Sequence, residues 1–328
     1  MPHQGKNEKA HSNKGSRSEA DDGKEPRPAF SPQPIIITDQ LLRNWPLPQP
    51  DEGGDKEERG RVLVVGGSAE MPGAIILSAM AALRAGAGKL RIATVAEIAP
   101  FVASNVPEAR VFSLSETKSG AISSGESERI AEEANKVQAV VIGPGMIDSR
   151  AVRRLMMSLL PVIERPTVVL DAEALSCFAE APRFPDKVRC RTILTPHREE
   201  MAAMTGETEE TIAGSREETA LRAAQRFRAV VVLKGRETLI ASPEGEIYLN
   251  RAGNVGLATS GSGDVLSGII AGLAARRTDP IQATAWGVYL HARAGERLAE
   301  RIGPLGYLAR ELPAEIPSLM NEIREVRT

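Results

Sequence analysis

A run of small residues leads directly into an apolar segment with one carboxylate at its start, from Asn254 through Gly-Ser-Gly-Asp264 to Leu273. Gly261 and Gly263 permit positive φ values and let backbone amides approach an anion closely, and the first turn of a helix adds amides without helical partners. This pattern predicts an anion site in which Asp264 takes a proton from a group beside a bound phosphate. The alternative is that Asp264 only caps the helix. The small residues at 259–263 exceed what a cap requires, which favours phosphoryl transfer.

Four further loops follow apolar runs and carry residues that could bind a ligand. They contain Gly66-Gly67-Ser68, Gly143-Pro144-Gly145, Thr195-Pro196-His197 and Lys234-Gly235. Each also has a plain structural interpretation, since glycines form tight turns, Lys-Gly often ends a strand, and a lone histidine is often structural or exposed. The chain has no G-x-G-x-x-G, no P-loop, no zinc-ligand spacing and no G-x-S-x-G. Any metal is therefore expected to be Mg²⁺ that arrives with nucleotide phosphates, not an ion held by a protein cluster.

The segments that position these loops alternate between short aliphatic runs and helical patterns. Continuous apolar runs predict strands buried on both faces, at 61–66, 89–94, 139–143, 167–171, 192–195 and 229–234. A hairpin is predicted from 238–241 to 246–250. Helices are predicted at 73–85, 126–136, 149–163, 198–204, 215–228, 264–276, 280–302 and 312–326. The βαβ order predicts an α/β fold, with a doubly wound, mostly parallel sheet and helices on both faces.

Composition and charge narrow the class of protein. Hydrophobic residues make up 42% of the 328 and aromatics only 3%, so the core must be aliphatic. The net charge of −2 gives no reason to expect a nucleic-acid partner or a membrane surface. Residues 1–34 are predicted to be a disordered polar tail, 35–328 one domain, and 49–59 a flexible loop or a flap. Cys177 and Cys190 are expected to be free thiols, and without a hydrophobic signal core the expected location is cytoplasmic.

Six motifs in register identify a family resemblance. They are Gly66-Gly67-Ser68 with Pro72-Gly73-Ala74, Gly143-Pro144-Gly145, Leu170-Asp-Ala-Glu-Ala-Leu175, Leu194-Thr-Pro-His197, Leu233-Lys-Gly235 and Asn254 through Gly268. Together they resemble the ADP/ATP-dependent NAD(P)H-hydrate dehydratases of the ribokinase-like superfamily, over residues 36 to 312. The resemblance implies repair of hydrated NADH and NADPH with ADP as the expected donor, ATP as the alternative, and Mg²⁺. It also implies a separate epimerase as pathway partner and a homo-oligomer.

The resemblance assigns roles residue by residue. Asp264 is implied to be catalytic and to touch the substrate, which Ala74, Gly145 and His197 also contact. Nucleotide binding is implied for Lys234, Gly235, Arg236, Glu237, Thr238 and Gly263. Supporting roles are implied for Gly261, Ser262, Asn254 and Glu200. In this scheme the ring hydroxyl loses its proton to Asp264 and attacks the terminal phosphoryl group, and the ring nitrogen then expels phosphate. The amides of Ser262 and Gly263 are expected to stabilise the phosphate charge, and the helix start to keep Asp264 ionised and weakly basic.

The same residues are compatible with other functions. A small-molecule alcohol kinase of the same superfamily would use the same Gly-Ser-Gly-Asp element but release a stable phosphoester. A nucleotide-binding protein that has lost catalysis would bind nucleotide but show no turnover that depends on Asp264. An oxidoreductase is disfavoured because the dinucleotide fingerprint is missing. Arg198-Glu199 departs from the family pattern after the histidine and leaves the choice between NADH hydrate and NADPH hydrate undecided.

Overall fold

One sheet of ten strands organises the described part of the computed structural model, residues 33–49, 58–179 and 184–324. Its strand order is β1-β10-β9-β8-β7-β6-β5-β2-β3-β4, and β9 runs antiparallel to both neighbours while the other pairings are parallel. The strands are β1 (Ile35–Ile36), β2 (Arg61–Val65), β3 (Lys89–Val95), β4 (Ala109–Leu114), β5 (Ala139–Ile142), β6 (Thr167–Leu170), β7 (Arg191–Leu194), β8 (Val230–Leu233), β9 (Thr238–Ala241) and β10 (Ile247–Asn250).

The direction of winding reverses between β2 and β5, which are neighbours in the sheet. From β2 the chain continues outward to β3 and β4, and from β5 it continues in the other direction to β6, β7 and β8. Strands β5, β6 and β8 are fully buried, in agreement with their continuous apolar sequences. In a doubly wound sheet such a reversal opens a crevice at the carboxyl ends of the strands.

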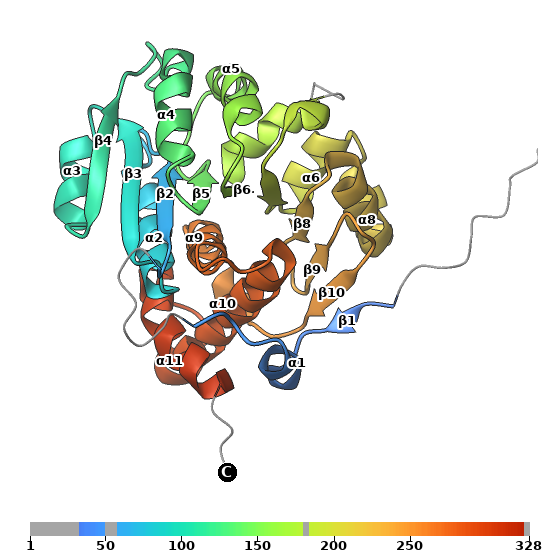
Figure 1. Cartoon of the computed structure of the whole chain (residues 1–328). Helices are drawn as coiled ribbons and strands as arrows, with labels where there is room; N and C mark the ends of the chain where they lie inside the picture. The colour runs from blue at the N-terminus through green and yellow to red at the C-terminus, as the bar shows by residue number, and fades with distance from the viewer. Residues whose placement is uncertain (1–32, 50–57, 180–183, 325–328) are drawn as a thin grey trace, which may run out of the picture. The chain divides into compact units, whose positions relative to one another are not determined.

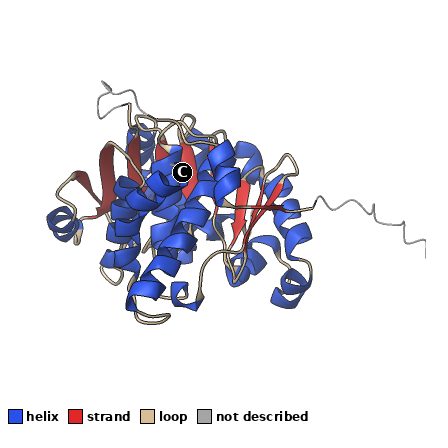
Figure 2. Cartoon of the chain, turned by 90° about the horizontal axis from the view of Figure 1, so that it is seen from below, coloured by secondary structure: helices blue, strands red, loops and turns tan. Residues whose placement is uncertain are grey.

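Helices cover both faces of this sheet. Figure 1 shows α2, α9, α10 and α11 on one side and α4, α5, α6 and α8 on the other, and Figure 2 shows helices lying across the strands. The helices are α1 (Asp39–Asn44), α2 (Pro72–Arg84), α3 (Ala99–Asn105), α4 (Ser127–Ala134), α5 (Ser149–Leu159), α6 (Arg198–Thr205), α7 (Glu209–Gly214), α8 (Arg216–Phe227), α9 (Ser262–Ala274), α10 (Pro280–Ile302) and α11 (Leu312–Arg324). Short 3₁₀ turns are η1 (Ser124–Glu126), η2 (Leu160–Val162), η3 (Ala172–Phe178), η4 (Phe184–Lys187), η5 (Val255–Leu257) and η6 (Ala309–Glu311).

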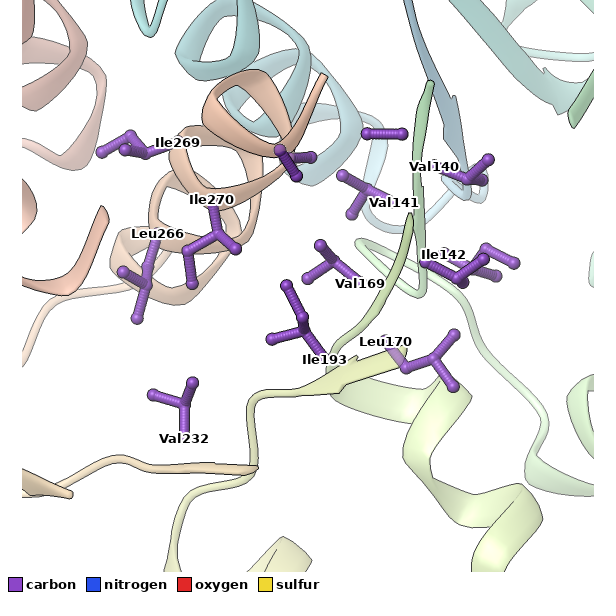
Figure 3. Packing of buried hydrophobic residues seen from close by; sticks show 14 of the residues in the cluster. Val140, Val141, Ile142, Val169, Leu170, Ile193, Val232, Leu266, Ile269 and Ile270 are labelled. Carbon is purple, nitrogen blue, oxygen red and sulfur yellow. The ribbon is translucent and has the colours of Figure 1, made fainter. Parts of the chain in front are cut away.

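Helix α9 lies in the core and is buried along nearly its whole length. Val141, Val169 and Ile193 share one register row of the sheet, and Figure 3 shows them on the side of Leu266 and Ile270 of α9. On the far side of α9, two glycines allow close packing against α2. A Cβ on Gly268 would lie 2.1 Å from the Ser78 carbonyl oxygen, and one on Gly272 would lie 2.4 Å from that of Ala82. The first turn of α9 is thereby held at a fixed place above the sheet.

The predicted doubly wound α/β fold and the predicted strands are confirmed, but five elements were missed. Strand β4 lies at the sheet edge with alternating exposure, and β1 has only two residues, so neither produces a continuous apolar run. The short helices α1, α3 and α7 have only six or seven residues and bury only one or two side chains each, so none shows a clear helical period. The predicted helix at 149–163 ends as α5 at Leu159 and continues as the 3₁₀ turn η2.

The N-terminal lead-in is held against α10 by hydrogen bonds. Trp286 Nε1 donates to the Trp45 carbonyl at 2.8 Å, and the Tyr289 hydroxyl donates to Asp39 at 2.7 Å. The predictions of a disordered tail over residues 1–34 and of a flexible loop at 49–59 fall largely outside the described residues. No helix in the described ranges is long and apolar enough to cross a membrane.

Candidate active site

The first turn of α9 forms the centre of the candidate site. Gly261 is the N-cap residue in the left-handed region, at φ 86°, and Asp264 is the third residue of the helix. The interpretation of Asp264 as the helix cap is therefore wrong. The amide of Ser262 donates to the Thr259 carbonyl at 3.2 Å, so it is not the free donor that the sequence predicted. Within the described ranges, the amides of Gly263 and Asp264 have no acceptor, which leaves two donors for an anion.

An ion pair between a partly buried lysine and a buried carboxylate lies beside this turn. Lys234 follows β8 and its Nζ lies 3.0 Å from Oδ1 of Asp171, which follows β6 and is 2% exposed. Thr195, after β7, donates its hydroxyl proton to the same Asp171 oxygen at 2.7 Å. A Cβ on Gly263 would lie 3.5 Å from Lys234 Nζ and 3.8 Å from Asp171 Oδ2. The glycine at 263 thus lets the helix start approach both charges.

The surroundings of Asp264 make its carboxyl a weak acid. Burial and repulsion from Asp171 raise the pKa of Asp264 to about 7, and attraction to Lys234 only partly opposes this. A helix start contributes about 0.3–1 kcal/mol toward ionisation, which is less than one pKa unit. The expectation of a permanently ionised, weakly basic carboxylate is therefore wrong. For Lys234, burial lowers the pKa, but the carboxylates of Asp171, Glu200 and Asp264 outweigh burial and raise it.

His197 and Glu200 are joined at the start of α6. The two residues form a capping box, in which the His197 amide donates to Glu200 Oε2 at 2.7 Å and the Glu200 amide donates to His197 Nδ1 at 3.3 Å. The same Glu200 oxygen lies 3.6 Å from Lys234 Nζ. The His197 side chain is 47% exposed. The structure thus connects the Thr-Pro-His motif to Lys234 through Glu200.

Ala74 and Gly145 lie next to each other, just beyond the carboxyl ends of β2 and β5. Gly145 has φ 69°, and a Cβ there would lie 2.5 Å from the Met71 carbonyl oxygen and 3.1 Å from Cβ of Ala74. The Gly67 amide donates to the Pro144 carbonyl at 2.7 Å, which binds the two glycine loops together. Strands β6 and β7 separate this pair from Lys234 at the end of β8. Sequence-predicted residues therefore occupy two places along one edge of the sheet.

The loop that follows β8 borders a cavity of about 560 Å³. Its walls include His197, Ile212, Arg216, Leu233, Lys234 and Gly235. Arg216 donates to the Glu237 carbonyl at 2.7 Å and holds the loop at its base. Arg236 also lines the cavity, and Thr238 begins β9, where it pairs with Asn250. The loop from Lys234 to Thr238 thus lies between this cavity and the first turn of α9.

Side-chain hydrogen bonds of Ser262 and Asn254 hold the small-residue run in place. The Ser262 hydroxyl lies 3.1 Å from Nε2 of the buried His291, and burial lowers the pKa of His291 to about 4, so this imidazole is neutral. The Asn254 side-chain oxygen accepts from the Gly256 amide at 2.8 Å and from the Tyr307 hydroxyl at 2.9 Å. Ser262 and Asn254 therefore hold the loop in shape through these side-chain contacts.

Three residues of the site were not assigned a role from the sequence. Asp171 and Thr195 stand inside quoted motifs, but only the parallel pairing of β6, β7 and β8 brings them to Lys234. His291 lies inside a long helix and carries no local signal. In the described ranges, no group of three His, Cys, Asp or Glu side chains could hold a metal ion. Within the described residues, the site therefore has no metal-binding cluster of its own.

Comparison with known proteins identifies the family of this chain. The family described as NAD(P)H-hydrate dehydratase matches residues 62–318. A relative from Xanthomonas campestris, named ADP-dependent (S)-NAD(P)H-hydrate dehydratase, is 45% identical over 293 residues, which cover 89% of this chain and 98% of the relative.

Solved structures agree in fold. The ADP/ATP-dependent NAD(P)H-hydrate dehydratase of Bacillus subtilis, co-crystallised with ATP and Mg²⁺, has a TM-score of 0.75 and 32% identity, and the match covers 89% of this chain and 99% of that one. A ribokinase-like superfamily protein from Enterococcus faecalis has a TM-score of 0.73 and 26% identity, over 88% and 96% of the two chains. The predicted ribokinase-like fold is therefore confirmed, and the chain belongs to the NAD(P)H-hydrate dehydratase family.

Proposed function

We propose that this protein restores NADH and NADPH from their (S)-hydrates in a reaction that consumes ADP. The observation that carries the proposal is the meeting of three features at the start of α9: two free amides, the Lys234 ammonium and the poised carboxyl of Asp264. The family supports the substrate, and the name of the Xanthomonas relative supports ADP as the donor. ATP remains the alternative donor.

In the proposed reaction, ionised Asp264 takes the proton of the ring hydroxyl as that oxygen attacks the terminal phosphoryl group. ADP loses this group and leaves as AMP. The amides of Gly263 and Asp264 stabilise the charge on the transferred phosphoryl group, an electrostatic contribution that usually dominates such reactions. The ring nitrogen lone pair then expels phosphate from the neighbouring ring carbon. Loss of a proton from the next ring carbon restores the carbon–carbon double bond of the reduced nicotinamide. A pKa of about 7 suits a general base that works near neutral pH.

The two parts of the site suit an elongated substrate and a second nucleotide. We assign Ala74, Gly145 and His197 to the hydrated dinucleotide. Because β5 and β8 are three strand spacings apart, the Gly145 loop and Lys234 are separated by roughly 14 Å. We assign Lys234, Gly235, Arg236, Glu237, Thr238 and Gly263 to the ADP, whose phosphates would bring any Mg²⁺ with them. A separate epimerase and a homo-oligomer stay predictions.

The test uses purified protein, NADH hydrate, Mg²⁺ and either ADP or ATP, and follows the return of reduced-nicotinamide absorbance. Recovery with release of free phosphate, lost in Asp264→Asn, is the expected result. Asp148→Asn is the matched control, because Asp148 caps α5 through its side-chain oxygen and Asn retains such an acceptor. A stable phosphoester on an added alcohol, with no recovery of NADH, would instead establish a small-molecule kinase. Nucleotide binding without either product would establish a protein that has lost catalysis.

A further inference from the structure

Asp171 occupies an unusual position for a residue with no assigned role. Its side chain is 3% exposed, and one carboxylate oxygen already accepts hydrogen bonds from the Thr195 hydroxyl at 2.7 Å and from the Lys234 ammonium at 3.0 Å. The other oxygen is the one that lies 3.8 Å from the position of a Cβ on Gly263. A buried carboxylate with a charged partner is thus directed at the first turn of α9, where Asp264 stands.

Fold stability alone gives little reason for such a pair. Burying a charge such as that of Asp171 costs several kcal/mol, and apolar residues of similar volume in place of a buried ion pair are often neutral or stabilising. Here the pair lies at the carboxyl ends of β6 and β8, beside two free amides. Its placement is explained if the charges act on the reaction at α9.

We propose that Asp171 is a positioning residue of this site: held by Thr195, it clamps the Lys234 ammonium beside Gly263 and places its own charge against the first turn of α9. The inference rests on the proposed function for the identity of the reaction, but the electrostatic relation can be measured without turnover. Asp171 touches neither substrate nor nucleotide in this scheme. It acts through Lys234 and through its own charge on Asp264.

The charged groups around Asp264 act in known directions. Asp171 opposes its ionisation and Lys234 favours it. Glu200 acts on Lys234 from α6, and the neutral His291 lies behind Ser262 on α10. Replacing Asp171 by Asn removes the repulsion and also frees Lys234 to attract Asp264 more strongly. Both effects lower the pH at which Asp264 ionises, so the pKa of Asp264 is expected to fall in this variant.

The experiment compares wild type, Asp171→Asn and Thr195→Val across pH 5 to 9. Asn keeps an acceptor for Thr195 and Lys234 but removes the charge, whereas Val removes one hydrogen bond and keeps both charges. In Asp171→Asn, the acidic limb of the pH profile of kcat/KM is expected to move to lower pH by about one unit. In Thr195→Val the limb is expected to stay in place while kcat falls. An unchanged limb in folded Asp171→Asn would overturn the proposal.

A second measurement separates this proposal from the proposed function. Titration of the Asp264 carboxyl by ¹³C NMR, assigned with Asp264→Asn, needs no substrate. The Asp264 signal is expected to titrate at lower pH in Asp171→Asn and at higher pH in Lys234→Gln. The Lys234→Gln variant still tests the effect of the neighbouring charges on Asp264 if Asp171→Asn fails to fold. Unchanged titration of Asp264 in folded Asp171→Asn would refute the role of Asp171, and unchanged titration in Lys234→Gln would refute the part played by Lys234. Absence of NADH recovery by wild type would refute only the function.

Glu315→Gln is the control for a merely structural effect. Glu315 is a largely buried carboxylate on α11, paired with Arg301 at 2.8 Å. Loss of its charge is expected to reduce stability without moving either the acidic limb or the Asp264 titration. A shift of equal size in Glu315→Gln would mean that the Asp171 effect is an indirect result of lost stability.

Discussion

Asp264→Asn is expected to make the protein more stable at alkaline pH while it removes activity. Folding raises the pKa of Asp264 from 3.8 to about 7, because the carboxyl is largely removed from water and faces Asp171. The folded state therefore binds the proton more tightly than the unfolded state. The stability that comes from this proton is complete below pH 3.8 and is lost as the pH rises through about 7. Asn resembles the protonated form at every pH.

The size of the effect follows from the same pKa values. One pKa unit corresponds to about 1.4 kcal/mol, so the rise from 3.8 to about 7 sets an upper limit of about 4 kcal/mol. Because the carboxyl keeps some contact with water, we expect Asp264→Asn to gain about 1–3 kcal/mol over wild type at pH 8.5. At pH 4 the two proteins should differ little.

The assay is urea unfolding at pH 4, 6, 7 and 8.5, with the midpoint compared between variant and wild type at each pH. Asp148→Asn provides a control of opposite sign. Hydrogen bonds from Ser119 and from the backbone at the start of α5 hold the pKa of Asp148 below its usual value. This variant should lose stability at neutral pH. An Asp264→Asn midpoint that exceeds wild type equally at pH 4 and 8.5, or never exceeds it, would refute the reasoning about burial and Asp171.

Three further outcomes are expected. Gly268→Ala should destabilise the fold by about 1–3 kcal/mol in urea unfolding, since its Cβ would lie 2.1 Å from the Ser78 carbonyl oxygen and must push α2 from α9. His291→Gln should flatten the loss of stability between pH 6.5 and about 4, because burial keeps wild-type His291 neutral while the unfolded chain takes up a proton there. Tyr307→Phe should lower the free energy of unfolding by about 0.5–1.5 kcal/mol in urea unfolding, because it removes the hydrogen bond from the Tyr307 hydroxyl to Asn254.

Much of the fold was predictable because strands buried on both faces produce continuous apolar runs. Strands β2, β3, β5, β6, β7 and β8 were all found in this way. Strand β4 was missed because a half-exposed edge strand alternates polar and apolar residues. The small-residue run before Asp264 also carried its own signal, since glycines at 261 and 263 are needed for a left-handed cap and for the approach of Lys234.

The sequence by itself determined the helix start, the strand ends and the residue types of the site, because these depend on local conformation and on short motifs. Only the tertiary structure decided which charges meet. Asp171, Lys234 and Asp264 are far apart in the chain, and the parallel pairing of β6, β7 and β8 brings the first two together below α9. A pKa depends on burial and on neighbouring charges, neither of which is local in sequence. For this reason the local pattern predicted an ionised Asp264, whereas burial and Asp171 in the folded site raise the pKa of Asp264 to about 7.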